Sequence, residues 1–139
     1  MNNNINKDKF GFTLFELLVS ISIIAILTAI ASMSFSGAQK KARDARRAQD
    51  MNSIQKAAEQ YYSQNNYTYP SSTGVLVSSG LMQLWPSDPK GVGFTAYVYN
   101  IATTYCACAA VENTASGNSS ANTCTFASSG AYYCVKSQQ

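Results

Sequence analysis

Histidine is absent from this 139-residue chain, and charged residues make up only 12% of it. Without histidine, the serine–histidine and cysteine–histidine nucleophile systems of hydrolases cannot form. The sequence also contains no glycine-rich phosphate loop and no paired-carboxylate constellation for acid–base catalysis. These absences predict a protein that is not an enzyme.

Acidic residues are scarce in the second half of the chain, where only Asp88 and Glu112 follow residue 59. A calcium site needs about six to eight oxygen ligands, usually with several carboxylates among them. We therefore expect no metal and no cofactor. The formal net charge of +3 is also too small to favour nucleic acid as the main partner.

No cysteine precedes Cys106, and the four that the chain has are Cys106, Cys108, Cys124 and Cys134. Because they contain no Cys-x-x-Cys pair, their spacing fits a zinc site poorly, and we expect two disulfides in an oxidising compartment. On a strand, Cys106 and Cys108 would share a face, and a bridge between them is geometrically poor. Two pairings remain open: 106–124 with 108–134, or 106–134 with 108–124. The second nests one loop inside the other and is weakly favoured.

The main feature of the chain is an apolar stretch at residues 12–35, in which Glu16 is the only charged residue. As a helix this stretch would be about 36 Å long, and about 20 apolar residues suffice to cross a bilayer. A secretory signal peptide has a shorter apolar region followed by its cleavage site. We therefore expect residues 12–35 to span a membrane and to stay in the mature protein.

A short positive leader precedes this span and ends at Gly11, and Phe12-Thr13-Leu14-Phe15-Glu16 follows it. This pattern resembles the N-terminal signature of type IV prepilins and type II secretion pseudopilins. The resemblance implies that a prepilin peptidase removes residues 1–11 and that Phe12 becomes the methylated N-terminus. It also implies that Glu16 is the acidic residue that the family retains.

Glu16 has a natural partner once the leader is removed. The new α-amine of Phe12 has a pKa of about 7.7 and is mostly cationic at neutral pH. If these helices pack side by side, Glu16 of one copy can pair with the Phe12 amine of the next. Buried polar pairs of this kind set register, so we expect the two residues to fix the stagger between copies of the chain.

Residues 36–64 are predicted to continue the same helix as its amphipathic half, because Met51, Ile54, Ala58 and Tyr61 repeat at helical spacing. The basic residues of this half are expected to form a solvated face near lipid headgroups or to contact other subunits. Helical spacing predicts three ion pairs on this surface: Lys40–Asp44, Arg46–Asp50 and Lys56–Glu59.

Residues 65–139 are predicted to form a globular head with a C-terminal sheet. Turn signals dominate up to residue 91, and residues 94–101, 105–112, 123–127 and 131–136 are β-prone. Residues 113–122 are expected to form an exposed loop. The predicted fold is α+β and pilin-like: one long N-terminal helix packed on an antiparallel sheet of three or four strands. Tyr69-Pro70 and Pro86-Ser87-Asp88-Pro89 also resemble pilin segments between helix and sheet.

The resemblance implies a structural subunit that begins as a single-pass inner-membrane protein with its C-terminal domain outside. Assembly machinery in that membrane would then polymerise copies of it into a type IV pilus-like surface filament. The basic residues after the span would keep that side cytoplasmic by the positive-inside rule. However, the cleavage motif faces a cytoplasmic peptidase in this family, and the cysteines favour an oxidising exterior.

Three alternatives remain open at this point. The first is a type II secretion pseudopilin, and the second is a minor pilin whose head is an adhesin or a DNA receptor. The third is a simple membrane-anchored extracytoplasmic domain that keeps residues 1–11.

Overall fold

The computed structural model describes residues 11–91, 93–101 and 104–139. It divides into two compact units, the first ending at Gly37 and the second beginning at Ala38. Of the predicted leader, only Gly11 lies within the described residues.

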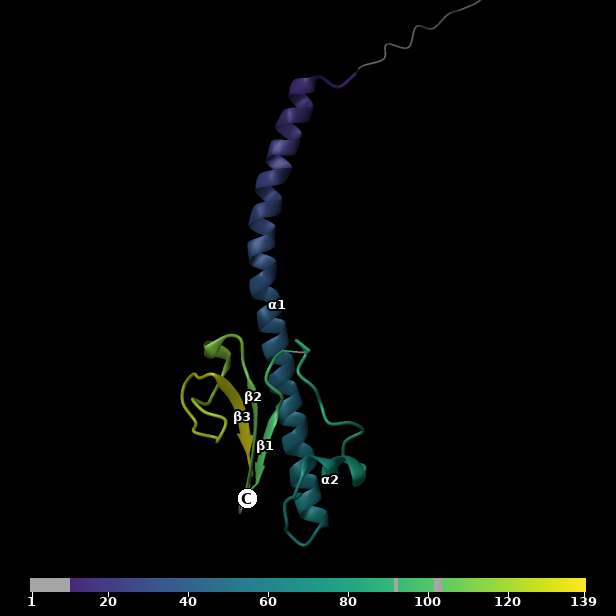
Figure 1. Ribbon diagram of the computed structural model, residues 1–139, viewed down its shortest axis with the longest axis vertical. Coiled ribbons are helices and arrows are strands. Elements are labelled where there is room, and N and C mark those ends of the chain that lie inside the picture. The colour runs from purple at the N-terminus through teal and green to yellow at the C-terminus, as the bar shows by residue number, and fades with distance from the viewer. Residues whose placement is uncertain (1–10, 92, 102–103) are drawn as a thin grey trace, which may run out of the picture. The chain divides into compact units, whose positions relative to one another are not determined.

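One helix, α1 (Leu14–Gln64), belongs to both units, as predicted (Figure 1). In the first unit, the leucine, isoleucine and phenylalanine side chains of residues 12–35 are all exposed. In the second unit, Met51, Ile54 and Ala58 are fully buried. This contrast follows from the sequence, because only the second half of the helix alternates apolar and polar faces.

The second unit contains a three-stranded antiparallel sheet with the strand order β1-β2-β3. Its strands are β1 (Val98–Ile101), β2 (Tyr105–Ala110) and β3 (Tyr132–Lys136). The sheet lies alongside the second half of α1 (Figure 1). The predicted α+β arrangement is therefore confirmed.

The β-prone run at residues 123–127 does not form a fourth strand. In the part of the chain that the structure describes, this run forms one isolated antiparallel β-bridge, between Phe126 and Ser119. The left-handed backbone of Cys124, with φ of 56°, interrupts the extended conformation that a strand requires.

The connecting segments contain more structure than the turn signals predict. A short helix, α2 (Thr73–Ser78), buries Leu76, and a 3₁₀ turn occupies Thr114–Ser116. The expectation that residues 113–122 are exposed is wrong for most of this segment: only Thr114, Ala115 and Ser120 are exposed, and Gly117 and Ser119 are buried. A Cβ at Gly130 would lie 1.9 Å from the Ser119 carbonyl oxygen, so only glycine fits where the two backbones meet.

The core of the second unit lies between α1, α2 and the sheet. Met51 and Ile54 from α1 meet Leu76 from α2 and Tyr105 from β2, all at most 1% exposed. Burying each of these side chains contributes about 1.5–3 kcal/mol. Alanines on α1 and β2 complete the contact and let the helix approach the sheet closely.

Candidate functional site

The N-terminal motif forms a defined local structure at the start of α1. The backbone N–H of Thr13 donates to Glu16 Oε2 over 3.0 Å, and the Thr13 hydroxyl donates to the same oxygen over 2.7 Å. The backbone N–H of Glu16 in turn donates to Thr13 Oγ1 over 3.2 Å. This reciprocal arrangement is a capping box, which satisfies backbone donors that have no partner inside the helix.

The prediction assigned Glu16 to contacts between copies and missed this role within its own helix. The signal was present in the sequence, because Thr13 and Glu16 have the Thr-x-x-Glu spacing of a capping box. Both contacts from Thr13 fall on Oε2. Among the described residues, Glu16 Oε1 accepts no hydrogen bond, so this oxygen is free for a further donor.

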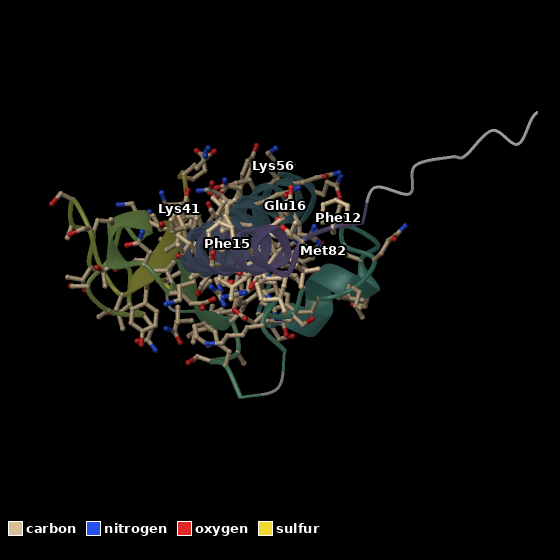
Figure 2. All side chains as sticks on the ribbon, turned by 90° about the horizontal axis from the view of Figure 1, so that it is seen from above. Phe12, Phe15, Glu16, Lys41, Lys56 and Met82 are labelled. Atoms are coloured by element: carbon tan, nitrogen blue, oxygen red, sulfur yellow. A yellow bond between two sulfur atoms is a disulfide. The ribbon has the colours of Figure 1, made fainter. Side chains whose placement is uncertain are left out.

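Phe12 lies directly before the helix and is 88% exposed. Figure 2 shows Phe12, Phe15 and Glu16 together at the N-terminal end of α1. Gly11 is exposed as well. The bond between Gly11 and Phe12 therefore lies in accessible, non-helical backbone next to the capped helix end.

The first half of α1 is long and apolar enough to cross a membrane. Its hydroxyls bond back to helix carbonyls, as Ser20 does to Glu16 O over 2.7 Å and Ser32 to Thr28 O over 2.8 Å. These bonds hide polar groups from an apolar environment. The assignment as a membrane span rests on length and composition.

The second half of α1 is tied to the head by a buried cluster of charges around Arg47. The Arg47 side chain is 0% exposed and contacts the carboxylates of Asp44, Asp88 and Glu112 over 2.6–3.0 Å. Arg43 donates to Glu112 from Nε over 2.6 Å and from Nη2 over 2.8 Å. Burial alone would lower the pKa of Arg47, but its hydrogen bonds to the three carboxylates raise it overall.

Further contacts complete this charge cluster. Asp44 accepts the backbone N–H groups of Glu112 and Asn113, each over 2.9 Å. The hydrogen bond from Arg43 lowers the pKa of Glu112 to about 2, against the opposing effect of burial. Glu112 therefore stays ionised at neutral pH. Asp88 and Glu112, the two carboxylates that follow residue 59, are both bound to arginine.

The prediction of a solvated basic face was thus wrong for Arg47. Asp88 and Glu112 lie far from Arg47 in the sequence, and only the tertiary fold brings them to its side chain. The predicted Arg46–Asp50 pair is present at 3.2 Å. Asp44 pairs with Arg47 rather than with Lys40. Glu59 does not pair with Lys56 in the described chain. Its carboxylate accepts hydrogen bonds from the hydroxyls of Tyr69 and Tyr105.

Two disulfides join the sheet to its C-terminal loop: Cys106–Cys124 and Cys108–Cys134. The weakly favoured alternative, 106–134 with 108–124, is wrong. Cys108 and Cys134 lie directly opposite each other in the β2–β3 register, which leaves Cys106 for Cys124. The four sulfur atoms lie within 4.8 Å of one another, so strand register rather than reach decides the pairing.

Comparisons with known proteins found one matching family profile and a relative of similar sequence. A family profile described as a prokaryotic N-terminal methylation motif matches residues 6–32. The type IV wide pilus major component PilA4 of Thermus thermophilus is 40% identical over 96 residues, which cover 69% of each chain. No solved structure matches the chain significantly.

Proposed function

The chain belongs to the type IV pilin family, and from this premise we propose that it is a structural subunit of a type IV pilus-like surface filament. It is made as a precursor, and a prepilin peptidase cuts it between Gly11 and Phe12. Phe12 is then methylated, and the mature chain polymerises with copies of itself through its N-terminal helix. The exposed Gly11–Phe12 bond and the matched motif support this processing.

One observation carries the proposal: the apolar half of α1 buries nothing within the described part of its own chain. The leucine, isoleucine and phenylalanine side chains between residues 12 and 35 are all exposed. A helix that is apolar all round needs lipid or other helices around it. The membrane supplies the first environment, and the helices of other copies supply the second after assembly.

Glu16 acts in this assembly as the register residue. Its Oε2 is held by Thr13, and Oε1 accepts the Phe12 amine of a neighbouring copy. Because the capping box fixes the carboxylate on the helix, the partner amine meets it at one axial offset.

Before assembly the subunit is a single-pass inner-membrane protein with residues 36–139 outside. Residues 36–64 form the amphipathic half of the helix and residues 65–139 form the head. Inner-membrane assembly machinery extracts the subunit into the filament. Since the relative is named a major component of a wide pilus, a major pilin is favoured over a secretion pseudopilin.

Intact mass and N-terminal sequencing of the protein from its own membrane or filament fraction test this proposal. The expected product begins at Phe12 and carries one extra methyl group. A chain that still begins at Met1 in a host with the peptidase would contradict it and favour a simple anchored domain.

A further inference from the structure

We propose that a pocket beside the C-terminal end of α1 binds a neutral saccharide. The pocket has a volume of about 400 Å³, within the range of small-molecule sites. Its lining comes from the end of α1, the turn after it, the end of β1 and the C-terminal residue: Tyr62, Tyr67, Thr68, Tyr69, Ser71, Ile101, Thr104 and Gln139.

Three tyrosine rings form one wall of this pocket. Tyr62 stacks on Tyr69 with centroids 4.4 Å apart, and Tyr67 meets Tyr62 edge-on at 5.6 Å. The Tyr69 hydroxyl donates to Glu59 over 3.1 Å, which holds its ring in place. Tyrosine offers a rigid contact surface at low entropic cost, and the apolar faces of a sugar ring can pack against it.

Tyr67 is the unusual member of this group, because a large aromatic side chain is 77% exposed there. Its backbone and that of Asn66 are left-handed, with φ of 56° and 50°. Left-handed residues commonly end a helix, and these two follow shortly after the last residue of α1, so the conformation belongs to its C-terminal cap. The chain keeps it through a hydrogen bond of 3.1 Å from the Tyr67 N–H to the Tyr62 carbonyl.

Among the described residues, the pocket is lined by hydroxyl, apolar and amide side chains and by no charged side chain. Thr68, Ser71 and Thr104 are exposed and offer donors and acceptors next to the rings. Two other hollows in the second unit differ, because one contains Arg46 with Asp50 and the other Lys56 with Glu59. A ring wall flanked by neutral hydroxyls, with no basic side chain among its described residues, fits an uncharged sugar better than an anion.

Saturation-transfer difference NMR on the full chain tests this, in a phosphocholine detergent that carries no sugar headgroup. The neutral probes are methyl α-mannoside, methyl β-galactoside and N-acetylglucosamine, and N-acetylneuraminic acid is the anionic probe. We expect transfer to at least one neutral probe and none to the anionic one. Because the subunit is not polymerised, the result does not depend on filament formation.

Tyr67→Ala should weaken binding by about tenfold, since it removes the exposed ring, whereas Tyr67→Phe keeps most of it. Ser71→Ala should also weaken binding and removes only a hydroxyl. Phe126→Ala, at another exposed aromatic residue of the head, is the control and should change nothing. Transfer to no neutral probe, or unchanged transfer in both Tyr67→Ala and Ser71→Ala, would overturn the proposal.

Discussion

Arg47 donates two hydrogen bonds to the carboxylate of Asp88, from Nε to Oδ2 over 2.6 Å and from Nη2 to Oδ1 over 2.8 Å. This bidentate pair ties α1 to the loop that precedes β1. The planar guanidinium still has Nη1 free to reach Asp44 and Glu112. Lysine has no such fork, so only arginine can join all three carboxylates in this geometry.

Replacing Arg47 should destabilise the head strongly. Arg47→Met leaves three carboxylates poorly solvated and without their main partner, and we expect the free energy of unfolding to fall by about 3–5 kcal/mol. Urea denaturation of the detergent-solubilised subunit, followed by the fluorescence of Trp85, measures this. Lys41→Met removes an exposed charge from the same helix and should leave the midpoint unchanged. Equal midpoints for the two variants would contradict the structural role of Arg47.

Acid should weaken the head through Glu112. Its pKa is about 2 in the folded chain and about 4.3 when unfolded. The stabilisation is therefore complete above about pH 4.3 and is lost as pH falls towards 2, because the unfolded state takes up the proton first. Urea midpoints measured between pH 6 and pH 2.5 should fall.

The matched variant is Glu112→Gln, which has no carboxylate to titrate. It should start less stable at pH 6 and lose stability less steeply below pH 4, by up to about 1.4 kcal/mol per pH unit. If its stability curve runs parallel to that of the original chain, Glu112 is not a source of the acid sensitivity.

Charge and capping at Glu16 can be separated by substitution. Glutamine also completes a capping box, so Glu16→Gln should keep the helix end and its cleavage. It carries no negative charge for the Phe12 amine, so few or no sheared filaments should appear in electron micrographs. Glu16→Ala loses both roles and should assemble no better. Normal filament yield from Glu16→Gln would show that the ion pair does not set register.

Double cysteine variants test the disulfide pairing. Cys106→Ser with Cys124→Ser leaves the 108–134 bridge and should show no thiol that reacts with an alkylating agent. Cys106→Ser with Cys134→Ser leaves one cysteine of each bridge without its native partner, and its urea midpoint should lie below that of the first variant. The opposite pattern would restore the pairing that the sequence weakly favoured. Losing the 108–134 bridge should cost about 2–4 kcal/mol of stability.

Much of this molecule could be predicted because the decisive patterns are local. The apolar stretch at residues 12–35 and the helical repeat of Met51, Ile54 and Ala58 depend only on neighbours along the chain. The strand at residues 123–127 was predicted wrongly because β-propensity ignores the left-handed backbone at Cys124.

The burial of Arg47 could not be read from its neighbours, since Lys40, Lys41, Arg43 and Arg46 around it look alike in sequence. Only the fold brings Asp88 and Glu112 to that one arginine. The disulfide pairing was equally hidden, because both open pairings close loops of similar size. The register of β2 against β3 selected one of them.

The sequence by itself determined the processing motif, the long helix and its change from apolar to amphipathic, because these depend on residue order and a fixed helical period. Tertiary structure alone decided which charges are buried, which cysteines pair and which tyrosines line a pocket. Those choices depend on where distant segments meet, and the spacing of residues along a chain does not contain that distance.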